Sequence, residues 1–209
     1  MNTKNKMALI GLGSMGYGMA SSLLRAGHTV YGFDVATANV DRFCADGGLS
    51  GAIEEVLPTV EIVVVVVLNA AQVESVLFGE SGIVQHLQPG ACVISCATIA
   101  PAQALDLSIR CAQNQVQYLD APISGGAVKA AAGKLSIMAS GPAETFATAQ
   151  PALDAMAETV FELGDQVGLG SAMKSVNQLL AGVQIASMGE AMTFGMKQGI
   201  APEKIVEVI

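Results

Sequence analysis

Hydrophobic and polar positions alternate along the first 163 residues in a pattern that predicts strands and helices in turn. Short apolar runs rich in β-branched residues are typical of strands, and the run IVVVVVL at 62–68 is apolar on both faces, as in a central parallel strand. The predicted strands are 7–10, 28–33, 62–68, 91–95, 116–119, 135–139 and 159–163. The predicted helices between them are 14–25, 36–45, 101–113 and 142–155. Strands that alternate with helices indicate βαβ units, and therefore an α/β fold with a doubly wound parallel sheet.

The pattern changes after residue 163, where the glycine-rich segment GDQVGLG begins. Residues 170–192 then read as one long helix that is apolar on nearly every face, and Pro202 marks the first turn of another helix. We therefore expect an α/β domain over 1–164, followed over 165–209 by an interdomain helix and the truncated start of a helical second domain. So much apolar surface needs cover, either from a partner chain or from further residues of a longer protein.

Composition and charge narrow the possible partners. Of the 209 residues 52% are hydrophobic, enough for a sizeable core, and the formal net charge is −8 without any basic run. That charge argues against sequence-independent binding of nucleic acid. The longest apolar run is far shorter than the roughly 20 residues of a membrane-spanning helix, and the N-terminus lacks the pattern of a secretory signal. We expect a cytoplasmic protein with neither a nucleic-acid nor a membrane partner.

The cysteines and histidines give no sign of a metal site or of a hydrolase. The four cysteines are Cys44, Cys92, Cys96 and Cys111. None belongs to a C-x-x-C pair, and two histidines are the only further candidates of that kind, so we expect reduced thiols and no bound metal. Neither histidine has a serine or cysteine neighbour to activate, which argues against nucleophilic hydrolysis.

A glycine-rich loop follows the first predicted strand and opens a helix. Its residues are Gly11, Leu12, Gly13, Ser14, Met15 and Gly16. In such a G-x-G-x-x-G loop the glycines permit a tight turn and a close approach of the backbone to a pyrophosphate, whose charge meets free N–H groups at the helix start. The motif alone is weak, and an ordinary glycine-rich turn is the alternative. The order strand, glycines, helix, strand and acid favours a dinucleotide site.

Asp34 supplies the acid of that order, at the end of the second predicted strand. Its carboxylate can accept hydrogen bonds from the ribose hydroxyls of a bound adenosine and would repel a 2′-phosphate. No Lys or Arg follows until Arg42, so we expect NAD rather than NADP as the cofactor. Leu68 and Asn69, at the end of the third predicted strand, are further candidates for cofactor contacts.

The turn formed by Ser124, Gly125 and Gly126 is a candidate for substrate binding. It follows the predicted strand 116–119, and open α/β sheets bind ligands beyond the carboxyl ends of their strands. A serine hydroxyl and successive backbone N–H groups can hold a carboxylate. A simple turn is the alternative, since glycine pairs often make one.

Lys174 stands in the long apolar helix, and no other Lys or Arg occurs between Lys134 and Lys197. Oxidation of a hydroxyl by hydride transfer needs a group that takes the hydroxyl proton. Desolvation lowers the pKa of an ammonium, which suits Lys174 to that task. The alternative is a surface lysine or one member of a structural ion pair.

Three segments resemble, in order and spacing, the signatures of the β-hydroxyacid dehydrogenase family, which includes 3-hydroxyisobutyrate dehydrogenase and tartronate semialdehyde reductase. They are GLGSMGYGMA at 11–20, DAPISGGAVKAAAGKLSIMASG at 120–141 and GLGSAMKSVNQLL at 168–180. The resemblance covers the whole chain and implies a Rossmann domain joined by a long helix to an all-helical domain. It also implies a homo-oligomer, a dimer or higher, in which helical regions of the subunits interlock.

The same resemblance implies roles for individual residues. Lys174 matches the catalytic acid/base of the family. Ser124, Gly125 and Gly126 match the residues that hold the substrate carboxylate. In the segment CATIAP, Thr98 matches a threonine that contacts the cofactor near the nicotinamide.

One departure from the family pattern concerns the substrate. Family members usually place Asn four residues after the lysine, whereas this chain has Gln178 there and Asn177 just before it. The run VNQLLAGVQIA at 176–186 is most similar to the L-threonate dehydrogenase branch, and a polyhydroxy acid offers Gln178 several hydroxyls. We therefore expect both amides to bind a small hydroxy-acid substrate, first of all L-threonate, oxidised at C2 to 2-oxo-tetronate with NAD. The alternatives are a 3-hydroxyisobutyrate dehydrogenase, a tartronate semialdehyde reductase and, in another class, a non-catalytic dinucleotide-binding module.

A second departure concerns length. Family chains continue with a helical segment that closes over the site and supplies another cofactor-contacting lysine, and this sequence ends before that segment. We therefore expect the 209-residue chain to bind NAD yet to turn over poorly.

Overall fold

The computed structural model describes residues 4–209 of the chain, which fall into two compact units. The first unit runs to Lys174 and the second covers 175–209. Within the described residues, no helix is both long enough and apolar enough to cross a membrane.

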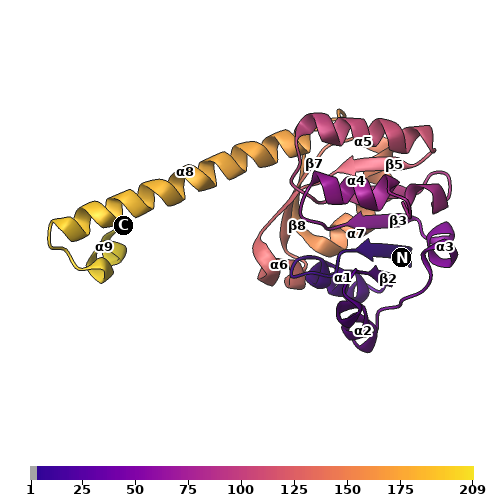
Figure 1. Ribbon diagram of the computed structural model, residues 1–209, viewed down its shortest axis with the longest axis horizontal. Helices are drawn as coiled ribbons and strands as arrows, with labels where there is room; N and C mark the ends of the chain where they lie inside the picture. The colour runs from indigo at the N-terminus through magenta and orange to yellow at the C-terminus, as the bar shows by residue number, and fades with distance from the viewer. Residues whose placement is uncertain (1–3) are drawn as a thin grey trace. The chain divides into compact units, whose positions relative to one another are not determined.

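The first unit is built on a five-stranded parallel sheet in the order β2-β1-β3-β4-β5 (Figure 1). Its strands are β1 (Lys6–Ile10), β2 (Thr29–Phe33), β3 (Ile62–Val65), β4 (Cys92–Ser95) and β5 (Gln117–Asp120). On the outer side of β2 a single parallel bridge joins Tyr31 to Leu49. The strand order of a dinucleotide-binding sheet is therefore present, with its third strand reduced to that bridge. The order reverses between β1 and β3, where such sheets bind their ligands.

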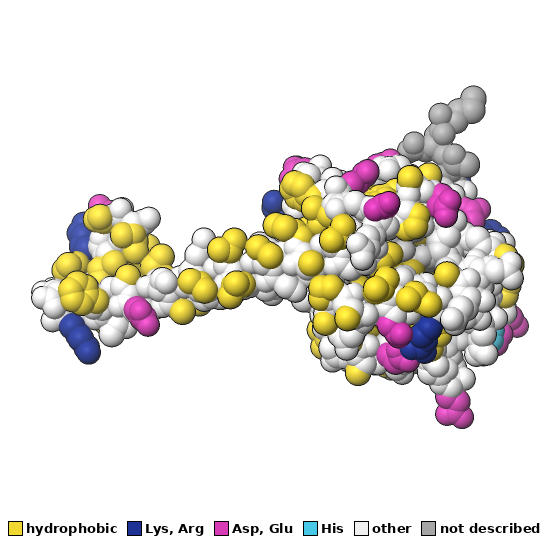
Figure 2. Space-filling view, turned by 90° about the horizontal axis from the view of Figure 1, so that it is seen from above, with side chains coloured by type: hydrophobic (Ala, Val, Ile, Leu, Met, Phe, Trp, Pro, Cys, Tyr) yellow, Lys and Arg dark blue, Asp and Glu magenta, His cyan; other side chains and the backbone are white. Residues whose placement is uncertain are grey.

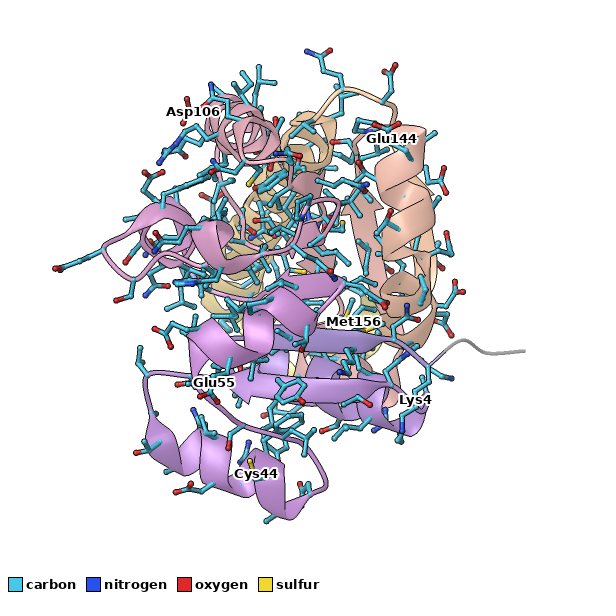
Figure 3. The ribbon with its side chains drawn as sticks, turned by 90° about the vertical axis from the view of Figure 1, so that its right-hand side faces the viewer. Lys4, Cys44, Glu55, Asp106, Glu144 and Met156 are labelled. Carbon is cyan, nitrogen blue, oxygen red and sulfur yellow. The ribbon has the colours of Figure 1, made fainter. Side chains whose placement is uncertain are left out.

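Helices cover both faces of this sheet. The helices of the first unit are α1 (Gly16–Arg25), α2 (Thr37–Ala45), α3 (Ile53–Val56), α4 (Ala70–Phe78), α5 (Pro101–Gln113), α6 (Gly126–Ala132) and α7 (Ala143–Met156). Figure 3 shows α5, labelled at Asp106, and α7, labelled at Glu144, on opposite sides of the strands. The doubly wound parallel sheet predicted from the sequence is thus confirmed.

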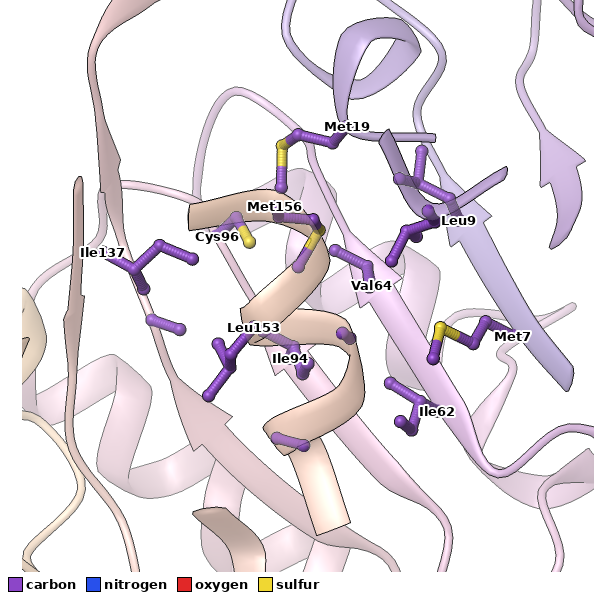
Figure 4. Packing of buried hydrophobic residues seen from close by; sticks show 14 of the residues in the cluster. Met7, Leu9, Met19, Ile62, Val64, Ile94, Cys96, Ile137, Leu153 and Met156 are labelled. Atoms are coloured by element: carbon purple, nitrogen blue, oxygen red, sulfur yellow. The ribbon is translucent and has the colours of Figure 1, made fainter. Parts of the chain in front are cut away.

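Successive residues of each central strand face different hydrophobic cores. Met7 and Leu9 of β1 belong to one buried cluster, whereas Ala8 and Ile10 belong to the other. Helices α1 and α7 complete the first cluster, and α4 and α5 complete the second. Figure 4 shows the first cluster, with Leu153 of α7 among the strand residues. Burial on both faces explains why these strands are almost continuously apolar in the sequence.

The last two predicted strands of the first unit belong to a second, three-stranded sheet. It consists of β6 (Ile123–Ser124), β7 (Leu135–Ala139) and β8 (Ala157–Glu162), with β6 antiparallel and β8 parallel to β7. The prediction of one sheet for all strands is therefore wrong for 135–139 and 159–163. Pro122 has no N–H for a sheet ladder, and the chain leaves the main sheet there to pair with β7 instead.

The second unit holds most of α8 (Leu169–Lys197) and all of α9 (Pro202–Val208). Between the two helices the N–H of Ile200 donates to the carbonyl of Gly195, a bond that closes the end of α8. Gly195 is buried, and a Cβ there would lie 2.6 Å from Cδ1 of Ile205 on α9. The close packing of α9 on α8 therefore depends on that glycine. The division between the units falls inside α8, so the first turn of the helix belongs with the α/β unit.

Candidate active site

The glycine loop connects β1 to α1, and at two of its glycines the backbone lies very close to other backbone atoms. Gly11 has φ +97°, its N–H donates to the carbonyl of Phe33 at 2.8 Å, and a Cβ there would overlap the carbonyl oxygen of Val66. A Cβ on Gly16 would overlap the carbonyl oxygen of Gly11. A side chain at either position would push the helix start away from the sheet. The two glycines therefore permit the tight turn that the sequence predicted, and they let the helix start close to the strands.

The tip of the loop is open. Gly13 and Ser14 are exposed, and a Cβ on Gly13 would meet no atom within 4 Å. Met15 is half-buried and precedes α1 without a side-chain cap on the helix. The N–H of Tyr17 already donates to the carbonyl of Gly13 at 2.9 Å, so an anion such as a pyrophosphate would approach the exposed backbone of Gly13 and Ser14 at the helix start.

Asp34 is fixed beside this loop by two backbone donors. Its Oδ2 accepts a hydrogen bond from the N–H of Leu12 at 2.6 Å, and its Oδ1 accepts one from the N–H of Ala36 at 2.8 Å. Each carboxylate oxygen keeps a second lone pair for another donor. The acid at the end of β2 is thus pre-oriented at the loop, as a ribose-binding acid must be.

A cleft of about 680 Å³ opens along the carboxyl ends of β1, β2 and β3. Its lining includes Gly11, Gly13, Asp34, Val35, Val67 and Leu68. Leu68 is 82% exposed at the rim of this cleft. Asn69 has another task, because its side chain accepts a hydrogen bond from the N–H of Gln72 at 3.0 Å and so caps α4. The carboxamide of Gln72 in turn accepts from the N–H of Leu68.

The order of the strands determines the order in which the candidate residues lie along this edge of the sheet. Asp34 follows β2, Gly11 follows β1, Leu68 follows β3 and Thr98 follows β4. Asp120 ends β5. Thr98 is exposed but does not line the cleft beside Asp34, so the structure brings the loop, Asp34 and Leu68 together and leaves Thr98 further along the edge.

The predicted carboxylate turn lies between β6 and α6. Ser124 is half-buried at the end of β6, while Gly125 and Gly126 are exposed with φ +134° and +75°. Two consecutive residues with positive φ favour glycine strongly. A Cβ on Gly125 would stand 3.0 Å from the side chain of Lys129. The turn therefore has the tight backbone that the sequence predicted.

Lys174 lies against this turn. Its side chain is 7% exposed, and Nζ donates a hydrogen bond of 2.8 Å to the carbonyl of Ile123, the residue before Ser124. Burial lowers the pKa of Lys174 below its ordinary value. No carboxylate of the described residues lies within ion-pair distance of Nζ, so the alternative of a structural ion pair finds no support there.

Asp120 is a residue of this region that the sequence reasoning missed. It is 1% exposed, and its carboxylate accepts hydrogen bonds from the N–H and the hydroxyl of Ser171 and from the N–H of Gly168. Burial raises the pKa of Asp120, and these hydrogen bonds oppose that rise. The acid itself was visible in the sequence, directly after the predicted strand 116–119, but its partner Ser171 was not.

Asn177 and Gln178 lie on the next turn of α8, beyond the boundary between the two units. Asn177 is half-buried and Gln178 is exposed. Their part in substrate binding stays a prediction.

Comparisons with known proteins identify the family. Residues 6–164 match the NAD-binding domain of 6-phosphogluconate dehydrogenase, and residues 168–209 match the NAD-binding family of NADP-dependent 3-hydroxyisobutyrate dehydrogenase. The chain belongs to the β-hydroxyacid dehydrogenase family. It therefore has an NAD-binding domain and is a member of a family of hydroxyacid dehydrogenases.

Relatives of this dehydrogenase match along almost all of the chain. It is 44% identical to L-threonate dehydrogenase of Cupriavidus necator over 97% of its own length and 69% of the relative's. The identity to L-threonate dehydrogenase of Escherichia coli K12 is 42%, over 97% of this chain and 68% of that one. Among solved structures, 3-hydroxyisobutyrate dehydrogenase from Salmonella typhimurium superposes with a TM-score of 0.91 at 38% identity, covering 99% of this chain and 72% of that one.

Proposed function

We propose that this chain oxidises the C2 hydroxyl of L-threonate, or of a closely related sugar acid, with NAD. The observation that carries the proposal is the buried ammonium of Lys174, held 2.8 Å from the carbonyl of Ile123 and so beside the Ser124 turn. The relatives named L-threonate dehydrogenase, 40–44% identical, support this substrate over the other acids of the family.

Each part of the site has a task in this reaction. Bound NAD supplies the chemistry of hydride acceptance. The hydroxyl loses its proton as the hydride leaves its carbon, and neutral Lys174 takes up that proton on Nζ. A buried ammonium releases its proton more readily than an exposed one, so more of the neutral amine is present at a given pH.

The substrate carboxylate is held, in this proposal, by the Ser124 turn. The hydroxyl of Ser124 and the backbone N–H groups of Gly125 and Gly126 are the donors, and they cluster within one tight turn. Asn177 and Gln178 are proposed to bind the remaining hydroxyls of the sugar acid. Shorter acids such as 3-hydroxyisobutyrate leave these amides with fewer partners.

Preference for NAD over NADP is proposed to come from Asp34. Both of its oxygens are oriented by backbone donors, so the carboxylate cannot turn away from a 2′-phosphate without breaking those bonds. A carboxylate held in this way favours ribose hydroxyls and repels phosphate.

NADH formation from candidate substrates tests the proposal. L-threonate, 3-hydroxyisobutyrate and D-glycerate are assayed with NAD and with NADP, on the 209-residue chain and on any longer chain that its gene encodes. Lys174→Ala is compared with Lys134→Ala, a matched change at an exposed lysine whose Nζ lies 3.9 Å from Glu158. Activity on L-threonate with NAD that is lost in the first variant and kept in the second supports the proposal.

Other outcomes of that assay contradict defined parts of the proposal. Faster turnover of 3-hydroxyisobutyrate or D-glycerate would overturn the assigned substrate and the role of Gln178. NADH binding without any turnover in the longest chain would favour a non-catalytic dinucleotide-binding module. Brisk turnover by the 209-residue chain itself would contradict the expectation of poor turnover.

We also propose a homo-oligomer that forms through the helical region. Large apolar side chains of the second unit are exposed, and Figure 2 shows hydrophobic atoms along it. They include Leu179, Leu180, Val183, Ile185, Met188 and Phe194. Light scattering on the purified protein gives the oligomeric state directly, and a monomer at assay concentration would contradict this proposal. The proposed location is the cytoplasm, where the free thiols of the four cysteines stay reduced.

A further inference from the structure

We propose that Asp120 is a positioning residue that holds the first turn of α8, and Lys174 with it, against the Ser124 turn. The inference rests on the proposed function, because it assigns the means by which the acid/base reaches its place. The carboxylate of Asp120 lies at the end of β5, whereas Lys174 lies on α8.

The start of α8 has its free backbone donors satisfied by other elements. The carboxylate of Asp120 accepts from the N–H of Ser171 at 2.8 Å, from the hydroxyl of Ser171 at 2.7 Å and from the N–H of Gly168 at 3.1 Å. Ser140, after β7, accepts the N–H of Gly170 on its hydroxyl oxygen at 2.9 Å. A negative charge at a helix N-terminus is favourable, and here it is also the anchor of the helix.

The helix start is also in close contact with the strand ends. A Cβ on Gly170 would lie 2.5 Å from the carbonyl oxygen of Met138 and 2.8 Å from that of Asp120. The residue therefore must be glycine if Ser171 is to reach the carboxylate. Packing and hydrogen bonds fix the same turn of α8.

Two contacts then join α8 to a single stretch of chain. Ser171 and Lys174 are three residues apart on α8, and so are Asp120 and Ile123 on the segment that meets it. Residues three apart on a helix share a face. Asp120 binds Ser171 at one end of the helical turn, and the carbonyl of Ile123 binds Lys174 at the other. If the first contact is lost, the turn is free to move and the ammonium gains access to water.

The pKa of Lys174 separates this role from a purely electrostatic one. Loss of a nearby negative charge by itself would lower the pKa of an ammonium, because the carboxylate favours the charged form. Release of the helical turn would raise the pKa toward its ordinary value, because burial is what lowers it in the intact site. The two causes therefore act in opposite directions.

The experiment compares Asp120→Asn and Ser171→Ala with the native chain. Asn offers one oxygen and turns its NH2 group toward donors, so it cannot replace the carboxylate. Ser171→Ala removes the hydroxyl bond and keeps the backbone one. Asp165→Asn, an exposed acid in the segment before α8, is the matched control for loss of one charge. The apparent pKa of Lys174 is taken from the pH dependence of its labelling by an amine reagent, followed by mass spectrometry.

The expected result is a raised pKa of Lys174 in Asp120→Asn, a smaller rise in Ser171→Ala and no change in the control, with NADH binding retained. Where turnover is measured, kcat falls about 100-fold in Asp120→Asn while the KM for NAD is unchanged, because misplacement affects the chemical step. An unchanged or lowered pKa in folded Asp120→Asn overturns the inference. If that variant does not fold, Ser171→Ala decides by the same criterion. Since labelling needs no turnover, a failed substrate assignment leaves this test intact.

Discussion

The carbonyl oxygen of Ile123 accepts a hydrogen bond from Nζ of Lys174 across two segments that are 51 residues apart in the chain. Ile123 belongs to the second sheet and precedes the Ser124 turn, while Lys174 belongs to the second turn of α8. Lys174, the candidate base, therefore contacts the residue that directly precedes Ser124, the first residue of the candidate carboxylate site.

Replacement of Lys174 by Ala is expected to lower kcat about 100- to 10,000-fold, the range that a positioned acid/base contributes. Lys174→Arg restores the charge and lacks a group that can accept the proton near neutral pH, so it should be equally inactive. NADH affinity, measured by fluorescence titration, should stay within about twofold of native in both variants, since the cleft at Asp34 lies elsewhere on the sheet edge. Full activity in Lys174→Arg would show that Lys174 acts by charge alone.

The lowered pKa of Lys174 predicts how its replacement alters stability with pH. Between the folded and the unfolded pKa values the unfolded state binds more protons, so the contribution of Lys174 to stability rises with pH. At pH values below the pKa of Lys174 in the folded state, the buried ammonium is fully charged and lowers the free energy of unfolding by its largest amount. Lys174→Met should therefore raise the free energy of unfolding most at neutral pH, and the gain should shrink as the pH approaches the ordinary lysine value. Urea denaturation at a series of pH values measures this, and a gain that grows with pH would contradict it.

Asp34→Asn is expected to shift the cofactor preference toward NADP. The amide keeps one acceptor and loses the charge that repels a 2′-phosphate, while NAD binding should weaken roughly tenfold, as expected when a charged hydrogen-bond acceptor is lost. Asp41→Asn on α2, at an exposed position, is the control for net charge. Dissociation constants for NADH and NADPH give the ratio. An unchanged ratio would remove Asp34 from cofactor selection.

Two glycines of the cofactor loop are expected to differ in their response to alanine. Gly16→Ala places a methyl group on the carbonyl of Gly11 and should cost about 1–3 kcal/mol of stability, as overpacking does. A Cβ at position 13 meets no atom within 4 Å, so Gly13→Ala should leave the stability of the fold unchanged. The added methyl group should nevertheless hinder the close approach of a pyrophosphate to the loop backbone and weaken NADH binding. Thermal unfolding and NADH titration of both variants separate the two effects. Equal losses of stability would contradict the assigned contacts.

Much of the fold follows from local patterns in the sequence. The β-branched run of β3 and the glycine loop before α1 are each recognisable within a few residues, so a buried strand and a strand-to-helix loop were predictable at these places. Lys174 was conspicuous because a charge in an apolar helix requires a reason. Sequence periodicity of this kind says little about partners that are far apart in the chain.

What the sequence did not predict depends on such long-range partners. The segment after Asp120 turns away from the main sheet to pair with β7, and β6 has only two residues, too few for any periodicity. Helix α6 has only seven residues and begins at Gly126, directly after Gly125, so the glycine pair was interpreted as a turn and no helix was predicted there. The hydrogen bond from Ser171 to Asp120 joins residues that are 51 positions apart in the chain, so it has no local signature in the sequence.

The stretch from Asp120 to Gly126 has a consequence for how such an enzyme evolves. One short peptide contains both the proposed anchor of the Lys174 helix and the proposed carboxylate turn, whereas the proposed cofactor cleft is built from other strand ends. A single insertion in that peptide would disturb proton transfer and substrate anchoring together. Changes around Asp34 leave both untouched. We expect cofactor choice to drift within a lineage while this peptide is inherited as a unit.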